Sequence, residues 1–247
     1  MIQYWNERTD LLIGDEAMEC LRNAHVLVVG VGGVGAYAAE MLVRAGIGAI
    51  TIIDADDINP TNINRQLPAL HSTVGLSKVD VLAARFLDIN PDLKMDARQC
   101  YLKDKLISEL LDEVKPDFVV DAIDTITPKV DLIAESTRRK LPLISSMGAG
   151  AKRDVTKVQF AKLKDTYHCG LSRQVRKRLK KMGFNHQKMM VVFCSEAPDP
   201  NALLKVKNEE NKKTTCGTIS YMPTVFGCYL AEYVIRKLIT PQNDTIK

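Results

Sequence analysis

The chain contains a strand, a glycine-rich turn and a helix in the order that phosphate binding requires. Val26–Val29 is an apolar run typical of a strand buried on both faces, and residues 36–45 have the composition of a helix. The turn between them contains Gly30, Gly32, Gly33 and Gly35. Such glycines allow a tight turn, a close approach of backbone to phosphate, and close packing of the helix on the strand. Because a helix N-terminus also presents unpaired N–H groups, the stretch predicts a nucleotide site.

Charged side chains beyond the next strand indicate the chemistry of this site. The expected strand Ala49–Ile53 ends at Asp54, about twenty residues after the last glycine, where a carboxylate usually binds a ribose hydroxyl. Arg65 follows in a polar loop, and Lys78 lies in the first turn of another expected helix. Two cations at one site favour a polyphosphate whose charge is neutralised during group transfer, whereas hydride transfer needs neither. The alternative is a glycine-rich turn that binds no ligand.

Strands and helices are expected to alternate through the first 150 residues. Further strands are predicted at 93–102, 118–121 and 143–146, and further helices at 77–89, 105–114 and from near Pro128 to Arg139. This alternation predicts an α/β fold, Rossmann-like, with a mostly parallel sheet and helices on both faces. Asp124 comes just after the strand 118–121, so it should lie at the carboxyl edge of the sheet, where such folds bind ligands.

The order of these blocks resembles the ubiquitin-activating-enzyme-like adenylyltransferase superfamily. The blocks are G-x-G-G-V-G at 30–35, D-x-D-x-I-x-x-x-N-x-x-R-Q at 54–66 and G-x-x-K at 75–78. The resemblance covers residues 8–150 and implies that ATP binds at the glycine turn, with Asp54 on the ribose and with Arg65 and Lys78 on the phosphates. It implies further contacts from Asp56, Asn62 and Gln66.

The same resemblance implies roles for two residues outside the nucleotide loop. The matching aspartate, Asp124, would hold Mg²⁺, for which a carboxylate is a suitable hard ligand; the alternative is that Asp124 caps the helix near Pro128. The segment Glu7–Gly14 resembles the block whose arginine reaches the triphosphate of a neighbouring subunit. Arg8 is therefore a candidate arginine finger in a homodimer, and the alternative is a solvated arginine in a frayed N-terminus.

Over nearly its whole length the sequence resembles one group of that superfamily, the tRNA threonylcarbamoyladenosine dehydratases. The matching segments are 8–14, 175–180, 191–196 and 220–227. This resemblance implies ATP-dependent cyclisation of threonylcarbamoyladenosine in tRNA through an adenylated carboxylate. The main alternative is an adenylyltransferase that activates the C-terminus of a ubiquitin-like sulfur carrier. An NAD-dependent reductase and a non-catalytic nucleotide-binding module explain the charged loop less well.

Composition indicates an ordinary intracellular enzyme. The 247 residues can bury a large core, and the six cysteines form no C-x-x-C pair, so we expect free thiols, a cytoplasmic location and no zinc. The N-terminus has no apolar signal core. The most apolar late stretch, Tyr221–Ile239, contains three charged residues and favours a buried or dimer-facing helix over a membrane span.

Positive charge is concentrated in the second part of the chain. Residues 151–213 contain 16 Lys and Arg against 6 Asp and Glu, whereas the remaining residues contain 18 against 24. A basic amphipathic helix is expected within 167–183, with these tRNA-binding candidates: Arg173, Arg176, Lys177, Arg178, Lys180 and Lys181. The alternatives are a solvated helix face and an acidic membrane surface.

The C-terminal part is expected to serve substrate binding and dimerisation. We expect one adenylation domain over residues 1–247, with an ATP-binding core at 8–150 and a basic part at 151–247 that combines helical and antiparallel segments. Residues 197–215 have the composition of a flexible loop. Cys216 follows this loop and is a candidate reactive thiol, able to accept an acyl group or a persulfide from a sulfur-transfer partner such as a cysteine desulfurase system. The alternative is a small buried hydrophobe.

Overall fold

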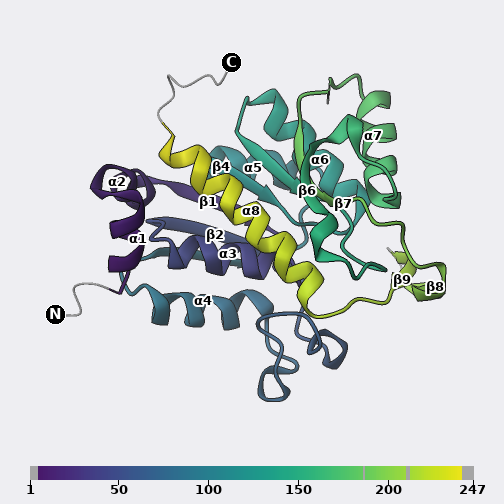
Figure 1. Cartoon of the computed structure of the whole chain (residues 1–247), viewed down its shortest axis with the longest axis horizontal. Coiled ribbons are helices and arrows are strands. Elements are labelled where there is room, and N and C mark those ends of the chain that lie inside the picture. Colours follow the sequence, from purple (N-terminus) through teal and green to yellow (C-terminus); the bar gives the residue numbers. More distant parts are fainter. Residues whose placement is uncertain (1–4, 186, 210–211, 241–247) are drawn as a thin grey trace.

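A seven-stranded sheet forms the centre of the protein (Figure 1), in a computed structural model that describes residues 5–185, 187–209 and 212–240. The strand order is β3-β2-β1-β4-β5-β7-β6. In chain order the strands are β1 (His25–Val29), β2 (Ala49–Asp54), β3 (Lys94–Gln99), β4 (Phe118–Asp121), β5 (Leu143–Ser146), β6 (Val158–Lys162) and β7 (Met190–Cys194). All neighbours are parallel except the edge strand β6, which runs antiparallel to β7. The carboxyl ends of six strands therefore meet along one edge.

Helices cover both faces of the sheet, as the alternating sequence predicted. One face carries α3 (Gly35–Arg44), α4 (Lys78–Ile89) and the long α8 (Tyr221–Ile239), and the other carries α5 (Lys105–Val114) and α6 (Ile126–Arg138). The basic helix α7 (Gly170–Lys181) packs on α6, and α1 (Glu7–Ile13) and α2 (Asp15–Asn23) precede β1. The short 3-10 helices are η1 (Pro60–Asn62), η2 (His71–Thr73), η3 (Val155–Lys157), η4 (Leu163–Asp165) and η5 (Pro200–Ala202).

The central strand contributes alternate side chains to two hydrophobic cores. Val26 and Val28 pack in the core under α3, α4 and α8. Leu27 and Val29 pack in the core under α5 and α6. Successive side chains of a strand point to opposite faces, so a strand apolar at every position must be covered on both sides. The continuous apolar run in the sequence was therefore a correct signal for a central parallel strand.

Helix α8 lies very close to α3, and a glycine allows that approach. A Cβ atom added at Gly227 would lie 2.6 Å from the Val34 carbonyl oxygen and 2.9 Å from the Ala38 nitrogen. Helix α8 crosses the sheet in front of α3 in Figure 1. Because α3 begins at the glycine turn, this contact fixes the helix whose N-terminus is predicted to face a nucleotide.

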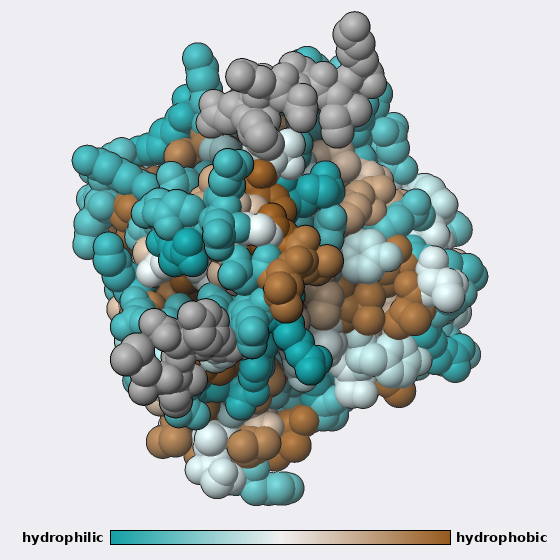
Figure 2. All heavy atoms as spheres, turned by 60° about the vertical axis from the view of Figure 1, so that its left-hand side comes forward, coloured by the Kyte–Doolittle hydropathy of each residue, from teal (hydrophilic) through white to brown (hydrophobic). Residues whose placement is uncertain are grey.

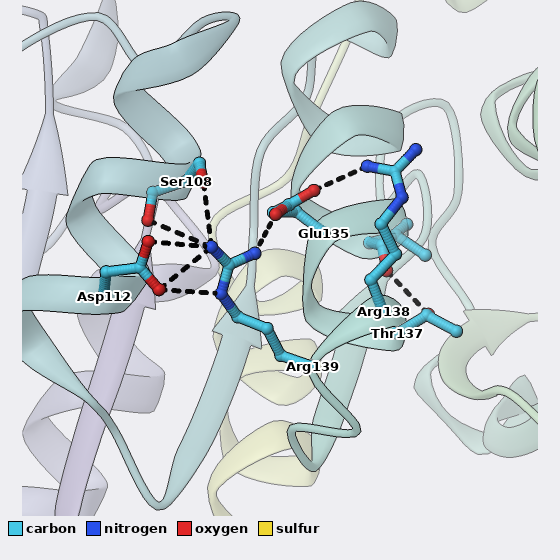
Figure 3. Close-up of polar contacts among 7 residues, drawn as sticks. Ser108, Asp112, Glu135, Thr137, Arg138 and Arg139 are labelled. Atoms are coloured by element: carbon cyan, nitrogen blue, oxygen red, sulfur yellow. Dashed lines mark hydrogen bonds and ion pairs between the residues drawn. The ribbon is translucent and has the colours of Figure 1, made fainter.

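On the opposite face, one arginine joins α5 to α6 (Figure 3). Arg139 lies just after α6, and its guanidinium donates to Asp112 at 3.0 Å and to the Ser108 hydroxyl at 2.8 Å, both on α5. It also pairs with Glu135 on α6. Three partners around one planar guanidinium hold the two helices in register.

The fold prediction is confirmed, but one segment was misread. Residues 197–215 are not a flexible loop: they include η5 and a two-stranded antiparallel sheet of β8 (Leu203–Glu209) and β9 (Lys212–Cys216). The prediction failed because the signal in this hairpin is weak: only Leu204 and Val206 alternate with lysines in the first strand, and the second strand has no such alternation. The strand predicted at 93–102 is shorter, since β3 covers only Lys94–Gln99.

The face that carries α1 and α2 has hydrophobic side chains in separate patches among hydrophilic ones (Figure 2). Leu11 and Leu12 on α1 are 81% and 83% exposed, and α1 buries none of its own residues. Among the helices within the described ranges, none is long and apolar enough to cross a membrane.

Candidate functional site

The glycine turn connects β1 to α3 with almost no space for side chains. Gly30 has φ +84°, and a Cβ atom there would lie 2.9 Å from the Ala122 carbonyl oxygen. A Cβ atom at Gly35 would lie 1.8 Å from the Gly30 carbonyl oxygen, which no rearrangement of side chains could relieve. The turn therefore leads directly into the N-terminus of α3, where backbone N–H groups and the helix dipole favour an anion.

Asp54, at the end of β2, holds the turn from the side. One carboxylate oxygen accepts a hydrogen bond from the Val31 N–H at 2.8 Å, and the other accepts from the Asp56 N–H at 2.9 Å. Burial raises the pKa of the Asp54 carboxyl, while the positive charge of Lys78 and these two backbone donors oppose that rise. Its remaining lone pairs are available to a hydroxyl donor such as a ribose.

Lys78 joins this site from the first turn of α4. Its ammonium lies 2.7 Å from Asp56 Oδ2 and 3.8 Å from Asp54 Oδ1. The Lys78 side chain is 4% exposed, whereas that of Asp56 is 68% exposed. The structure therefore places Lys78, Asp54 and Asp56 together, as predicted, with the buried ammonium fixed between two carboxylates.

The loop after β2 brings Arg65 and Gln66 over the glycine turn. A Cβ atom at Gly33 would lie 3.3 Å from the Arg65 carbonyl oxygen, and one at Gly32 would lie 3.6 Å from Gln66 Nε2. One terminal nitrogen of the Arg65 guanidinium donates to the Thr61 carbonyl at 2.8 Å and to the Asn64 side chain at 2.9 Å. Among the described residues the buried Gln66 side-chain oxygen has no hydrogen-bond partner, so it is an acceptor that a ligand donor could satisfy.

Asn62 has a local role in this loop. Its side-chain oxygen accepts from the Asn59 N–H at 3.0 Å, and Asn59 in turn accepts from Thr61 N–H at 2.9 Å, forming a capping box around η1. Asn62 is 9% exposed. The structure therefore shows Asn62 fixing the shape of the loop that presents Arg65 and Gln66.

Asp124 lies on an exposed turn between β4 and α6, at the same carboxyl edge. Below it, the buried Asp121 carboxylate lies 2.8 Å from the Lys129 ammonium, accepts from the Ser145 hydroxyl at 2.6 Å, and accepts from the Ile123 N–H at 3.1 Å. Lys129 also donates to the Ile123 carbonyl at 2.9 Å. This network fixes both backbone groups of the residue that precedes Asp124.

The donor set at this edge fits a magnesium ion shared with phosphate oxygens. No group of three or more His, Cys, Asp or Glu converges into a metal site within the described ranges. Mg²⁺ bound to a nucleotide usually takes only one or two carboxylates from the protein and completes its shell with phosphates and water. Asp124 would supply one exposed carboxylate at the same carboxyl edge as the predicted phosphate site, which is compatible with that pattern.

The predicted basic helix is α7, and it packs on α6 through Val175 and Leu179, both buried. Arg173, Lys177, Arg178, Lys180 and Lys181 are exposed. Among the described residues, none of the α7 cations forms an ion pair with an acidic side chain. Arg178 donates to Thr127 at 2.7 Å, near the N-terminus of α6, so the cationic surface reaches toward the turn that carries Asp124.

Arg176 differs from the other five cations. It is half-buried, and its guanidinium donates to the carbonyls of Leu163 at 3.0 Å and Thr166 at 2.9 Å and to the Thr166 hydroxyl. Helical periodicity placed it on the exposed cationic face, but these contacts give it a structural role in holding the segment before α7.

With this geometry in view, comparison with known proteins decides the family. The model of the ThiF family matches residues 7–247. The chain belongs to the ThiF family. It is 39% identical to the tRNA threonylcarbamoyladenosine dehydratase of Bacillus subtilis over 94% of this chain and 93% of that relative.

Solved ThiF-family structures are also similar over almost the whole chain. The Escherichia coli tRNA N6-threonylcarbamoyladenosine dehydratase in complex with ATP has a TM-score of 0.85 and 35% identity, covering 94% of this chain and 93% of that one. The same enzyme has been solved in complex with AMP. The molybdopterin-synthase adenylyltransferase of Salmonella typhimurium is 32% identical, but over only 62% of this chain and 61% of that relative.

In this ThiF-family chain the N-terminal candidate Arg8 lies on α1 and is exposed. Helix α1 packs mainly on α2, which leads into the amino end of β1, so Arg8 lies away from the carboxyl edge that carries the predicted nucleotide loop. Any contact between Arg8 and the triphosphate would thus come from a second subunit, and this role stays a prediction.

Cys216 ends β9 and lies against the loop after β5. A Cβ atom at Gly150 would lie 2.7 Å from Cys216 Cβ, and the Ala151 N–H donates to the neighbouring Gly217 carbonyl at 2.8 Å. Burial and the nearby Cys169 raise the pKa of the Cys216 thiol. A raised pKa reduces the thiolate fraction at neutral pH, so this environment does not activate Cys216 as a nucleophile. Its reactivity stays a prediction.

Sequence reasoning missed the network under Asp124. Lys129 and Asp121 are both buried and polar, which is rare unless the charges are paired. The available signal was an aspartate at the end of an apolar strand, followed eight residues later by a lysine in a helix that is otherwise apolar on that face. Nothing local distinguishes that lysine from a solvated one.

Proposed function

We propose that this chain is an ATP-dependent tRNA threonylcarbamoyladenosine dehydratase, which cyclises threonylcarbamoyladenosine in tRNA with loss of one water. The observation that carries the proposal is the similarity to dehydratases over more than nine tenths of both chains, at 39% identity in one case. A solved relative with 35% identity is in complex with ATP, and the glycine turn, Asp54, Lys78 and the Arg65 loop lie close together in this chain, which supports ATP binding there.

ATP is needed because direct cyclisation would have to expel hydroxide from the carboxyl group, and hydroxide is a poor leaving group. An oxygen of the threonyl carboxylate attacks the α-phosphorus of ATP, the bond to pyrophosphate breaks, and an acyl-adenylate forms. A nitrogen of the carbamoyl group in the same modified nucleoside then attacks the activated carbonyl and loses its proton, while the bond between that carbonyl and AMP breaks. The products are the cyclic nucleoside, AMP, pyrophosphate and a proton. The nucleophile and the carbonyl belong to one small group, so the second step gains from high effective molarity.

Two cations of the chain would stabilise the charge that moves onto the phosphates. Lys78 is pre-positioned between Asp54 and Asp56, and ATP would compete with Asp56 for its ammonium. The Arg65 guanidinium has donors beyond the nitrogen that contacts Thr61 and Asn64. Fixed donors directed at developing charge are usually the largest contribution to such catalysis. When bound, Mg²⁺ held by Asp124 would neutralise phosphate charge and orient the α-phosphorus.

Arg8 would act across a homodimer. The position of α1 on the side of the amino end of β1 supports a contact from a second subunit rather than from the same one. Mixing Arg8→Ala subunits with Asp124→Ala subunits should restore part of the activity, because one of the two sites in a mixed dimer is then intact. Absence of any rescue under conditions where subunits demonstrably exchange would remove the proposed role of Arg8.

The tRNA would bind along α7, which extends from the carboxyl edge of the sheet past the turn that carries Asp124. Cations on one helix face, unpaired with acids in the described part of the chain, are the usual contact for a phosphate backbone. A ubiquitin-like carrier presents a flexible tail instead. The molybdopterin-synthase relatives favour a carrier-activating function, but they match only 62% of this chain.

One incubation distinguishes these functions. The protein is mixed with ATP and tRNA that carries threonylcarbamoyladenosine, and the nucleosides are then analysed by mass spectrometry. We expect the modified nucleoside to lose the mass of one water, with one AMP formed per nucleoside converted. An unchanged nucleoside, together with ATP–pyrophosphate exchange that depends on a carrier protein, would favour the alternative.

A further inference from the structure

An exposed tyrosine lies in the segment between η4 and α7. Tyr167 is 51% exposed, and its ring contacts the rings of His168 and the buried Phe193. The centroid distances are 5.1 and 5.5 Å, and the ring planes meet at 76° and 73°. Neither neighbour therefore stacks face to face on Tyr167, and more than half of the side chain faces solvent.

The segment that carries this tyrosine is fixed on both sides. Before it, the Thr166 carbonyl and hydroxyl and the Leu163 carbonyl all accept from Arg176. After it, His168 Nδ1 lies 3.0 Å from the Ser195 carbonyl oxygen, and the Cys169 sulfur accepts from the Gly148 N–H at 3.4 Å. An exposed aromatic ring held this way loses little conformational entropy when it binds a partner.

The same contacts place Tyr167 at the edge of the sheet where the nucleotide site lies. Ser195 directly follows β7, and Gly148 comes two residues after β5. Both strands are parallel to β4, whose carboxyl end leads to Asp124. Tyr167 precedes α7 by three residues, so it lies at this edge beside the N-terminus of the helix that carries the exposed cations.

We propose that Tyr167 stacks on an unpaired nucleobase of the RNA substrate and so guides the modified nucleoside toward the ATP site. The proposal rests on the proposed function, because it takes RNA as the partner of α7. Proteins bind unstacked bases on exposed aromatic rings, while basic side chains contact the phosphate backbone without regard to sequence. The cations of α7 can contact the phosphate backbone, and Tyr167 is placed to stack on a base.

This division assigns two different tasks to the three arginines of the helix. Arg173 and Arg178 are exposed and can contact phosphates. Arg176 acts on Tyr167 indirectly, because it holds Thr166, the residue before it. Arg176 is thus a positioning residue for the stacking site rather than a phosphate contact.

The test compares Tyr167→Ala with Tyr167→Phe, which keeps the ring and removes only the hydroxyl. Tyr101→Ala is the matched control, since Tyr101 is 44% exposed and follows β3, the outer strand on the other side of the sheet from β7 and β6. The probes are tRNA with threonylcarbamoyladenosine, a single-stranded oligoribonucleotide and an RNA duplex of equal length. Dissociation constants are measured over a range of salt concentrations.

We expect Tyr167→Ala to bind tRNA and single-stranded RNA about tenfold more weakly, as loss of one stacked base implies, and to bind the duplex as wild type does. Tyr167→Phe and Tyr101→Ala should bind like wild type. The salt dependence should not change, because stacking releases no counterions. In turnover assays the loss should appear in KM for tRNA, with kcat kept at saturating tRNA.

Three results would overturn the stacking proposal. They are unchanged RNA affinity of Tyr167→Ala, an equal loss for the alanine and phenylalanine variants, and an equal loss for duplex and single-stranded RNA. Circular dichroism of the variants separates these results from misfolding. If the wild-type protein binds RNA with this pattern but does not dehydrate the nucleoside, the proposed function fails and the stacking site stands.

Discussion

The Lys129 ammonium lies 2.8 Å from the Asp121 carboxylate, and neither side chain has any solvent-exposed surface. The pair is satisfied by further hydrogen bonds to Ser145 and to both backbone groups of Ile123. A buried ion pair is not in itself a source of stability, since desolvation offsets the attraction. The position of the pair suggests its role: it fixes the turn that carries Asp124.

Replacement of Lys129 by Met should therefore destabilise the fold and disturb the site. Removing one partner leaves the Asp121 carboxylate buried without its counter-ion, which costs about 3–5 kcal/mol in comparable pairs. Urea unfolding measures the change in the free energy of unfolding. The double variant Lys129→Met, Asp121→Asn is the control, because it removes both charges and should recover part of the loss. If the single and double variants are equally unstable, the charge pair is not the cause.

Arg65→Ala should lower tRNA-dependent ATP–pyrophosphate exchange by roughly 10²–10³-fold, the usual loss when one charge-stabilising donor is removed. Folding should survive, because the described contacts of this guanidinium stay within its own loop. Arg98→Ala is a suitable control, since Arg98 forms a comparable surface network with Asp96 and Glu113. Exchange at the wild-type rate in Arg65→Ala would remove Arg65 from the catalytic group.

Charge reversal on α7 should weaken tRNA binding and reduce its salt dependence. Lys177→Glu with Lys180→Glu removes two exposed cations, and each lost phosphate contact should reduce the slope of log K against log salt by about 0.7–0.9. The control pair is Lys94→Glu with Lys115→Glu, because Lys94 starts β3 and Lys115 precedes β4, at the opposite edge of the sheet. Filter binding at several salt concentrations gives both quantities. Equal effects of the two pairs would mean that only net charge matters.

Glu40→Gln should make the protein less stable at neutral pH but not in acid. Glu40 on α3 accepts from Arg85 on α4 at 2.6 and 2.9 Å and from Arg44 at 2.9 Å. Burial alone would raise the pKa of Glu40, but these donors hold it below its ordinary value of 4.5. A carboxyl group whose pKa is lowered by folding stabilises the folded state when the pH is above the ordinary pKa of the group. This stabilisation is lost as the pH falls through the lower pKa of the folded state.

The expected difference between wild type and Glu40→Gln is about 1–2 kcal/mol above pH 5, reduced by the partial exposure of Arg85. It should shrink as the pH falls below 4.5. Thermal or urea unfolding across this range tests it. A difference that is constant with pH would show that the glutamine changes packing rather than charge.

Much of the sheet could be predicted because the relevant signals are local. The helix Lys105–Val114 and the strands Phe118–Asp121 and Leu143–Ser146 match the predicted bounds at both ends. In each case a proline or a charged residue stands at one end of the apolar run or helical period: Pro116 after the helix, Asp121 at the end of one strand and Pro142 before the other. The grouping of Asp54, Lys78 and the glycine turn was also predictable, because carboxyl ends of parallel strands share an edge.

Features that depend on distant contacts could not be predicted. Periodicity placed Arg176 with the exposed cations, yet the carbonyls that bind it belong to residues 163–166. Lys129 has the sequence signature of any helical lysine, and only the arrangement of β4, β5 and α6 makes it a buried partner of Asp121. The hairpin of β8 and β9 has only a short apolar alternation, Leu204 and Val206, in one strand and none in the other, which is too weak to identify a strand.

The most direct test of the account follows oxygen atoms through the reaction. The tRNA is prepared with ¹⁸O in both carboxylate oxygens of threonylcarbamoyladenosine and is converted by the wild-type protein with unlabelled ATP. If the carboxylate attacks the α-phosphorus, one ¹⁸O must leave in AMP while the other stays in the cyclic nucleoside. Unlabelled AMP, with the ¹⁸O recovered in orthophosphate or in water, would contradict an acyl-adenylate at the Gly30–Gly35 site.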